Sequence, residues 1–540
     1  MDRPNILFAF ADDWGRYASC YASHERPNSL NALVRTPNID RVADEGVLFT
    51  NAVVPAPSCT PCRSSVLSGR YFWQTGLGAI LHGAVWDETI PSFPLLLEGA
   101  GYHIGFTYKV WSPGTPKDQP FGGASRCYEP GGRDFGRYSF VATERAGGPH
   151  VVDPDRVEAA KRTLDEETRA NFAAFLDAGD QASPFCYWWG PTNTHREWQR
   201  GSGRTLWGID PSELTGRLPG FLPDVHEVRE DVADYLGECM AFDRGLGVLL
   251  DVLAERGRLD DTLVVVSGDH GIPGFPRGKC NLYDIGTEVA LVARLPRLIR
   301  AGRVVDDMVN LMDLAPTFLE AGRVAPPPDL PARSLMPLLT AEGSGQIDPT
   351  RTFAVTGRER HVGFAREWNL PYPHRAIRTS THLYIRNYAP DRWPMGDPRG
   401  LDDPDVTPPD FHVLEHETYA AYADMDAGPT KAWMIHHRGD PRRRAAFELG
   451  FGKRPAEELY DVVADPDTTR NLAGDPAHEA ERSRLARALE EELTRQRDPR
   501  VVETDCRYDL PPFTDATGPH GDAEDAPEVR LARVRRLPEP

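Results

Sequence analysis

Short, continuously apolar runs alternate with longer amphipathic stretches through residues 1–345. The apolar runs predict buried strands; they lie at residues 5–11, 184–189, 263–267 and 288–295. In the amphipathic stretches, apolar side chains recur every three or four positions, which predicts helices; they lie at residues 92–100, 168–178 and 228–256. Because strands that are apolar on both faces are typical of parallel sheets covered by helices, the pattern predicts an α/β fold.

The alternation breaks at a proline triplet, residues 326–328, and at a stretch containing Gly, Ser and Gln, residues 342–346. We place a domain boundary there, because such residues interrupt helices and strands. The expected units are residues 1–345, a smaller unit of residues 346–500 and a polar, loosely packed tail of residues 501–540. In the smaller unit we expect strands at residues 352–356, 376–378 and 383–387, a long loop at residues 390–409 and a helix at residues 477–497.

Composition narrows the class of protein. The 540 residues carry 61 Lys and Arg against 81 Asp and Glu, a net charge of −20. This balance argues against nucleic acid as a partner, because phosphate binding needs a basic surface. No run of about 18 apolar residues is present, so we expect no membrane span. The eight cysteines are scattered, which is not the pattern of a disulfide framework.

The first residues lead directly into the first predicted strand, with no apolar leader. The sequence as it stands therefore predicts a cytoplasmic protein. If an export signal has been trimmed, the expected location is the periplasm or the medium.

Acidic pairs follow two of the predicted strands. Asp12 and Asp13 come directly after residues 5–11, and Asp269 with His270 follows residues 263–267. Ligands bind at the carboxyl ends of parallel strands, and carboxylates that converge there repel one another unless a cation bridges them. Either pair alone is better interpreted as turn or cap residues. Both pairs at strand ends, with a cysteine motif between them in the sequence, predict a metal site.

That cysteine motif is Cys59-x-Pro61-x-Arg63, followed by a run of small residues that ends in Gly69-Arg70. It holds a thiol near a guanidinium, just before a predicted helix start, which is typical of a reactive residue. Cys59-x-x-Cys62 also matches a redox motif or half of a zinc site. A redox motif should follow a strand in a thioredoxin-like unit, and a zinc site needs a second pair of ligands. Neither context is present.

Together these motifs resemble the sulfatase family, in which the cysteine of this motif is oxidised to formylglycine. The resemblance spans roughly residues 3–475. It implies an alkaline-phosphatase-like α/β fold: a mixed, mostly parallel sheet sandwiched by helices, with a smaller C-terminal α+β domain. It also implies a sulfuric ester hydrolase that removes sulfate ester or sulfamate groups.

The resemblance places a divalent metal ion among five residues. They are Asp12, Asp13, the modified Cys59, Asp269 and His270. Many sulfatases have Asn at the last position. Carboxylate oxygens suit Ca²⁺ or Mg²⁺, and an imidazole ligand makes Mn²⁺ more suitable than an all-oxygen shell would. We expect Ca²⁺, with Mn²⁺ or Mg²⁺ as the alternatives.

The mechanism that the resemblance implies begins with hydration of the formylglycine aldehyde. One hydroxyl, held on the metal, attacks sulfur, and the second then expels sulfate. Arg63 would hold the diol, Lys109 and Lys279 would bind sulfate, and His195 would protonate the leaving group. Taken alone, the lysines are better interpreted as surface charges, and His195 fits a capping or core role equally well. Trp111 stands where the family signature near Lys109 has a histidine.

Three further residues are expected to read the sugar: Arg358, His361 and Arg375. The loops that carry them resemble the corresponding region of the heparan N-sulfatase branch. The implied partners are a sulfated carbohydrate, with glucosamine favoured, and the maturing enzyme that makes formylglycine. A homodimer is left open.

Two other functions stay open on the sequence. Phosphodiesterases and phosphonate monoester hydrolases share the modified cysteine, and they often use a histidine ligand with Mn²⁺. A non-catalytic binder of sulfated glycans would result if Cys59 stayed a thiol.

Overall fold

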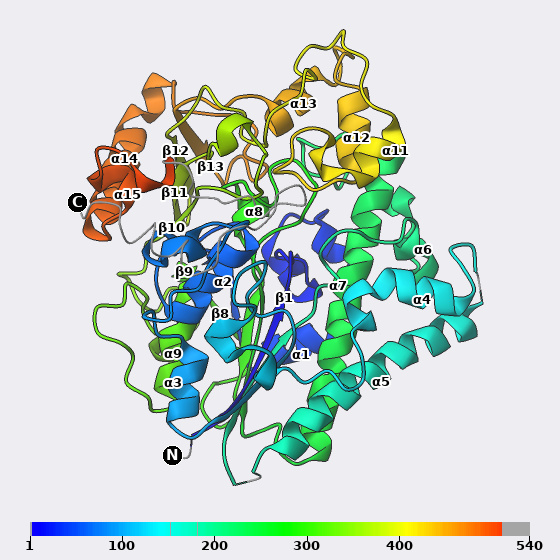
Figure 1. Ribbon diagram of the computed structural model, residues 1–540, viewed down its shortest axis with the longest axis vertical. Helices are drawn as coiled ribbons and strands as arrows, with labels where there is room; N and C mark the ends of the chain where they lie inside the picture. The colour runs from blue at the N-terminus through cyan, green and yellow to red at the C-terminus, as the bar shows by residue number, and fades with distance from the viewer. Residues whose placement is uncertain (1–2, 152, 181, 510–540) are drawn as a thin grey trace.

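The computed structural model describes residues 3–151, 153–180 and 182–509. Figure 1 shows a central sheet covered by helices and a second, smaller sheet formed by the later part of the chain. The central sheet has seven strands in the order β4-β5-β1-β6-β7-β2-β8. Their bounds are His103–Tyr108 (β4), Phe185–Gly190 (β5), Asn5–Ala11 (β1), Thr262–Gly268 (β6), Leu291–Arg294 (β7), Val47–Phe49 (β2) and Arg303–Val305 (β8).

Four neighbouring strands of this sheet, β4, β5, β1 and β6, run parallel to one another. β7 is antiparallel to β6 and to β2, and β2 pairs in parallel with β8. A separate parallel pair joins β3 (Ala52–Val53) to β9 (Val309–Asn310). The sheet is therefore mixed and mostly parallel, as the resemblance implies.

Both faces of the central sheet are buried because each strand contributes side chains to two hydrophobic cores. Along β1, Leu7 and Ala9 point into one core, and Ile6 and Phe8 into the other. This alternation follows from the two-residue repeat of a strand. A strand that lies between two cores has no polar face, which is why β1 and β6 are nearly continuous apolar runs.

Each core is closed by its own set of helices (Figure 1). On one face lie α1 (Pro37–Asp44), α4 (Tyr138–Ala146), α5 (Pro154–Ala178), α6 (Ser202–Trp207) and α7 (His226–Glu255). On the other lie α2 (Cys59–Ser68), α3 (Phe93–Gly99), α9 (Leu314–Ala321) and α10 (Met336–Leu339). The longest predicted helix, residues 228–256, is confirmed as α7.

The second sheet has four antiparallel strands in sequence order, which are β10 (Phe353–Arg358), β11 (His374–Thr379), β12 (His382–Asn387) and β13 (Glu457–Asp461). Helix α14 (Glu479–Arg495) packs its leucines into the same core as Tyr384 and Leu459. The remaining helices are α8 (Asp284–Thr287), α11 (Phe411–His416), α12 (Pro429–His436), α13 (Arg444–Phe451) and α15 (Pro499–Val502).

Most predicted elements are confirmed, and the differences have local causes. The strand expected at residues 288–295 is shorter, because the one-turn helix α8 ends directly before it and β7 begins only at Leu291. The helix expected at residues 168–178 is the last part of α5, which begins at Pro154 behind an N-cap formed by Asp153. The predicted loop at residues 390–409 contains no helix or strand.

The expectation of a loosely packed tail is wrong for its first part. Tyr508 is buried, and its hydroxyl donates to the backbone oxygen of Trp73 at 3.2 Å. Residues 510–540 of the predicted tail lie outside the described residues. The boundary at residue 345 stays a prediction. Among the helices of the described ranges, none is both long and apolar enough to cross a membrane.

Arg375, expected to bind substrate, is instead part of the frame of the second sheet. Its guanidinium is fully buried and pairs with Glu359 at 2.7 Å and with Asp498 at 2.5 Å. Arg500 also pairs with Glu359, so a network of charges joins β11 to the segment after α14. Because carboxylates already hold the guanidinium, it is not available to a sugar, and we do not retain its predicted role.

We predict that Arg375→Ala destabilises the protein by about 3–5 kcal/mol, because two buried carboxylates lose their shared partner. Urea unfolding followed by circular dichroism measures this. Arg386→Ala is the matched control: Arg386 lies opposite Arg375 on β12 but is exposed, and its loss should change stability by less than about 0.5 kcal/mol. Equal stabilities of the two variants would contradict the structural role.

Candidate active site

The candidate site is built where four parallel strands end side by side. Because β4, β5, β1 and β6 are neighbours, the segments that follow them meet at one edge of the sheet. They carry Lys109 after β4, His195 in the loop after β5, Asp12 and Asp13 after β1, and Asp269 with His270 after β6. Figure 1 shows that this edge faces the second sheet. All six residues are confirmed as neighbours in space.

Four buried side chains form a compact set of potential metal ligands: Asp13, Cys59, Asp269 and His270. One donor atom from each lies within 4.8 Å of all the others. His270 Nε2 is 3.1 Å from Asp13 Oδ1 and 3.4 Å from Cys59 Sγ. This spacing suits a single divalent cation between them, since metal–ligand distances in proteins are about 2.0–2.6 Å.

His270 is oriented by the backbone that follows it. Its Nδ1 lies 3.1 Å from the carbonyl oxygen of Gly271, so Nδ1 donates to this oxygen and Nε2 faces Asp13. Gly271 is needed for a close approach, because a Cβ there would lie 1.8 Å from the carbonyl oxygen of Ile285. The glycine thus lets the turn that carries His270 pack against α8.

Asp12 lies beside this set and is held by two cations. Lys109 Nζ contacts its carboxylate oxygens at 2.7 and 2.8 Å, and Arg63 contacts it at 3.1 Å. Arg63 also binds Asp269 at 2.8 Å, so the guanidinium spans the ends of β1 and β6. Burial opposes ionisation of Asp12, but Lys109 and Arg63 hold its pKa well below the usual range. Asp12 is therefore a carboxylate.

Cys59 is the first residue of α2, and its sulfur points toward the strand ends. It lies 3.6 Å from Asp13 Oδ1. Burial, together with the charge of Asp12, raises the pKa of the Cys59 thiol well above its ordinary value. An unmodified Cys59 would thus be a neutral thiol in these surroundings, which is a poor nucleophile.

Lys279 links the strand ends of the first unit to the second unit. Its ammonium lies 2.9 Å from Asp13, 3.3 Å from His195 Nε2 and 3.3 Å from Asp426. Asp426 was not among the predicted residues. It comes from the second unit, nearly 150 residues further along the chain, and only its position in an acidic Asp-Met-Asp sequence could have drawn attention to it.

A pocket of about 520 Å³ opens onto these groups. Asp12, Lys109 and His195 line it from the strand ends. Arg137 and Phe140 line its outer part, and the guanidinium of Arg137 lies over the Phe140 ring at 5.2 Å. The pocket is large enough for a sugar ring, and basic groups line it despite the overall negative charge of the chain.

The second unit reaches the site through His361, whose Nδ1 is 2.9 Å from the hydroxyl of Ser58, the residue before Cys59. Burial and the charge of Lys279 lower the pKa of His361, so it is neutral. Arg358 is also buried and lies 3.6 Å from Asp424. His361 thus contacts the residue that precedes Cys59, and Arg358 faces a carboxylate of its own chain. The predicted role of both residues in substrate binding stays a prediction.

Trp111, which stands where the family signature has a histidine, lies against the helix that presents Cys59. It is fully buried, and its indole nitrogen donates to the hydroxyl of Ser64 at 2.8 Å. Ser64 lies on α2, so Trp111 packs beneath the helix that presents Cys59. The side chain is therefore a support rather than a proton carrier.

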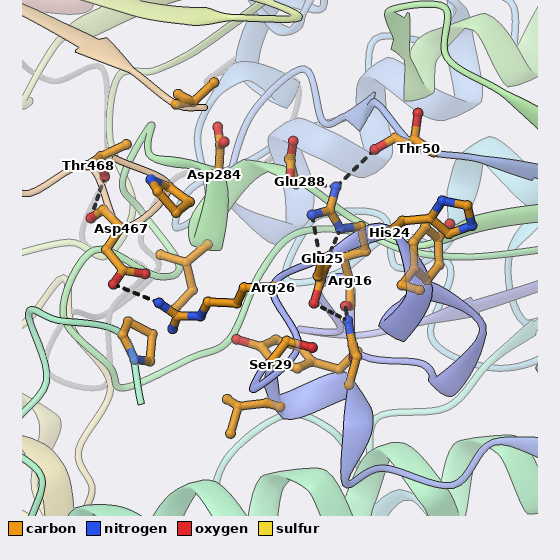
Figure 2. Close-up of a pocket in the computed structure, with 18 of the residues that line it drawn as sticks. Arg16, His24, Glu25, Arg26, Ser29, Thr50, Asp284, Glu288, Asp467 and Thr468 are labelled. Carbon is orange, nitrogen blue, oxygen red and sulfur yellow. Dashed lines mark hydrogen bonds and ion pairs between the residues drawn. The ribbon is translucent and has the colours of Figure 1, made fainter. Parts of the chain in front are cut away.

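Figure 2 shows a separate pocket of about 490 Å³, between the segment after β1 and the turn after β13. Its charged groups neutralise one another. Arg16 pairs with Glu25 at 3.1 Å and with Glu288 at 2.8 Å, and Arg26 pairs with Asp467 at 3.2 Å. Asp12, Lys109 and His195 do not line it, whereas all three line the pocket of about 520 Å³, which is therefore the candidate catalytic pocket.

The fold is of the alkaline-phosphatase-like type, and the site holds a buried set of carboxylate, thiol and imidazole groups that could bind a metal ion. The sulfatase family model matches residues 4–324. A second model, described as the C-terminal region of N-sulphoglucosamine sulphohydrolase, matches residues 275–405. The chain belongs to the sulfatase family and is a sulfuric ester hydrolase.

Curated relatives agree with this assignment. N-sulphoglucosamine sulphohydrolase of Homo sapiens is 29% identical over 501 residues, covering 87% of this chain and 86% of its own length. N-acetylglucosamine-6-O-sulfatase of Bacteroides thetaiotaomicron is 24% identical over 536 residues, covering 82% of this chain and 90% of its own length.

Solved structures share the fold at lower identity. A structure in complex with its substrate D-glucosamine-2-N,6-O-disulfate has a TM-score of 0.60 and 20% identity, covering 93% of this chain and 100% of the other. A phosphonate monoester hydrolase from Silicibacter pomeroyi has a TM-score of 0.57 and 19% identity, covering 93% and 97%. The fold thus does not separate these two activities.

The loop that carries His195 rests on a buried carboxyl group with a shifted pKa. Glu238 on α7 accepts hydrogen bonds from Asn193 Nδ2 at 2.9 Å and from the Ser139 backbone at 3.2 Å. Burial raises the pKa of Glu238 from 4.5 to about 7, although these hydrogen bonds favour the carboxylate.

We predict that Glu238 makes the protein less stable as the pH rises. Because the pKa is raised in the folded state, its contribution is fully present below pH 4.5 and is lost as the pH passes about 7. The loss amounts to roughly 3 kcal/mol. Urea unfolding at about pH 5 and about pH 9 should show a smaller decrease for Glu238→Gln than for the parent. The same decrease in both proteins would contradict this prediction.

Proposed function

We propose that this sulfatase removes sulfate from a sulfated glucosamine-type sugar, as a sulfate ester or a sulfamate, with Cys59 converted to formylglycine. The observation that carries the proposal is the convergence of Cys59 with Asp13, Asp269 and His270, next to Asp12 and His195, which line a pocket together with Lys109. An anionic sulfate group can meet cations in this pocket, and Cys59 lies close to it.

The comparisons support the choice of sugar. The family model of the C-terminal region and the human relative are both named for N-sulphoglucosamine sulphohydrolase. The bacterial relative is named an N-acetylglucosamine-6-O-sulfatase. These names share glucosamine and differ in whether sulfate is bound to nitrogen or oxygen. We favour glucosamine as the ring and propose that the pocket accepts a terminal residue of a sulfated glycan.

For the metal we propose Ca²⁺, with Mn²⁺ or Mg²⁺ as alternatives. The donor set fits a divalent cation: Asp13, Asp269, His270 and an oxygen of the modified Cys59 would hold it, with Asp12 beside them. The carboxylates suit Ca²⁺, and the imidazole of His270 favours Mn²⁺. A bound cation would neutralise the negative charge that the sulfate brings to these carboxylates.

Conversion of Cys59 is the step that makes this site reactive. The neutral thiol would be replaced by an aldehyde, through oxidation by a separate maturing enzyme, and the hydrated aldehyde offers two hydroxyls. One would attack sulfur and displace the sugar, and the other would expel sulfate and restore the aldehyde. The net reaction consumes one water for each sulfate released.

The other residues of the site would bind and move protons. Lys109 and Lys279 are placed on either side of the Asp12–Asp13 pair, where they would pair with the sulfate oxygens. Arg63 is committed to Asp12 and Asp269 and would keep Cys59 in register with them. His195 is the partly exposed imidazole of the pocket, with Nε2 directed toward Lys279. It would donate a proton to the leaving oxygen or nitrogen.

A second candidate function is hydrolysis of phosphate diesters or phosphonate monoesters. The observation that favours it is His270, an imidazole where many sulfatases have an amide. The fold is shared with a phosphonate monoester hydrolase. Comparing release of sulfate and of phosphate from matched aryl esters separates the two functions.

The test begins with Cys59 in protein isolated from its own host. Formylglycine is about 18 Da lighter than cysteine, because one sulfur and two hydrogens are lost and a carbonyl oxygen is gained, and an aldehyde-specific hydrazide traps it before hydration hides the change. We predict labelling at Cys59 and sulfate release from N-sulfated or 6-O-sulfated glucosamine.

Cys59→Ala is the control for this test. It should fold normally, give no hydrazide adduct and lose sulfate release by at least about 1000-fold. Binding of sulfated glucosamine without turnover by the parent protein, together with an unmodified thiol, would support the non-catalytic binder instead. Faster release of phosphate than of sulfate would favour the phosphonate hydrolase.

We predict that Asp426 positions Lys279 for the substrate. Asp426→Asn removes one of the two carboxylates that hold the ammonium, so kcat/KM for sulfate release should fall by about 10-fold to 100-fold, with most of the change in KM. Asp426→Glu should recover part of the loss because it restores the charge. Asp440→Asn is a control at a partly buried carboxylate that does not line the pocket, and it should leave kcat/KM unchanged. A fall in kcat/KM that Asp426→Glu fails to reduce would contradict the positioning role.

A further inference from the structure

A second group of potential metal ligands lies on α11, next to Glu197, a residue that lines the active-site pocket. His412, Glu415 and His416 occupy positions i, i+3 and i+4, so their side chains share one face of the helix. Leu414, on the other face, is fully buried in the core beneath. The packing of Leu414 therefore turns both imidazoles toward solvent. Figure 1 shows α11 beside α12, above the end of α7.

The geometry of this group suits a shared ion. One ligand atom from each of the three side chains lies within 4.8 Å of the other two. The imidazole rings of His412 and His416 are 4.5 Å apart between centroids, and His416 Nε2 is 3.7 Å from Glu415 Oε2. Two ligands bound to one zinc ion at about 2.1 Å in tetrahedral geometry are separated by roughly 3.4 Å.

A fourth residue, from another segment, orients one of these imidazoles. Glu197 Oε1 lies 3.4 Å from His416 Nδ1. A carboxylate that accepts the Nδ1 proton leaves Nε2 with a free lone pair, which here faces Glu415. Carboxylate–histidine–metal arrangements of this kind are common around metal ions in proteins. The other oxygen of Glu415 faces Arg200, which lies 3.5 Å away, so the two oxygens of Glu415 have different partners.

We propose that His412, Glu415 and His416 bind a divalent transition-metal ion such as Zn²⁺, with Glu197 holding His416 in the binding tautomer. Two imidazoles and one carboxylate form a ligand set that suits zinc and neighbouring first-row metals and does not suit Ca²⁺ or Mg²⁺, which prefer oxygen. This site is separate from the candidate catalytic metal site, because it shares none of its ligands.

The position of the proposed metal site, next to Glu197, connects the bound ion to the active-site pocket. Glu197 lines the same pocket as Lys109 and His195, and it lies two residues after His195. A bound ion would hold α11, through His416 and Glu197, against the loop that carries His195. Arg196 already anchors the middle of this loop, through Asp231 at 2.8 Å. Metal binding would thus restrain the outer end of the loop.

The experiment is calorimetric titration of the full-length protein with Zn²⁺, in the presence of excess Ca²⁺ and Mg²⁺. Any Zn²⁺ that enters the catalytic site should bind there in equal amounts in all variants, so it does not change the difference between them. We expect the parent protein to bind one more equivalent of Zn²⁺ than the double variant His412→Ala/His416→Ala. Equal numbers of equivalents in the two proteins would overturn the proposal. Both histidines are exposed, so their replacement should leave the fold intact, which circular dichroism checks.

Two single variants sharpen the result. Glu197→Gln should keep the extra equivalent and weaken its affinity by about 10-fold or more, since loss of an orienting carboxylate has effects of about 10–100-fold. An unchanged affinity would overturn the role of Glu197. His226→Ala is the matched control: His226 also faces a carboxylate four residues on, Glu230 at 3.9 Å, but it has no second imidazole beside it in the described structure. It should bind the same number of equivalents as the parent.

Discussion

The site depends on the balance of charge at the carboxyl ends of β1 and β6. Three carboxylates, Asp12, Asp13 and Asp269, are buried within a few ångströms of one another, and unpaired they would strongly disfavour the folded chain. Arg63, Lys109 and Lys279 supply three matching positive charges. The same six groups leave one face of Asp13 and Asp269 directed toward Cys59 and His270, where a divalent cation fits.

This balance requires both units of the chain. Lys279 is shared between Asp13 of the first unit and Asp426 of the second, and His361 of the second unit contacts Ser58 directly before Cys59. The second sheet is in turn held together by buried ion pairs around Arg375. Because Asp426 and His361 contact Lys279 and Ser58 directly, the second unit is part of the site.

This chain differs from the family pattern at Trp111 and His270, and the contacts around each residue show what it does. Trp111 supports α2 through Ser64, so the helix that presents Cys59 has a rigid base, while His195 is the imidazole that faces the pocket. His270 is oriented by the backbone of Gly271 and presents nitrogen instead of an amide oxygen to the ligand set.

Local pattern determined the central strands, the long helix α7 and the residues that follow each strand, because burial on both faces produces uninterrupted apolar runs and a parallel sheet brings its carboxyl ends to one edge. Asp12, Asp13, Asp269 and His270 could therefore be placed together from the sequence. The partners Asp426 and Glu197, and the buried position of Arg375, were decided only by the tertiary structure. An ion pair between residues nearly 150 positions apart leaves no periodic signal, and an arginine in the sequence looks the same whether it meets a carboxylate of its own chain or one of a substrate.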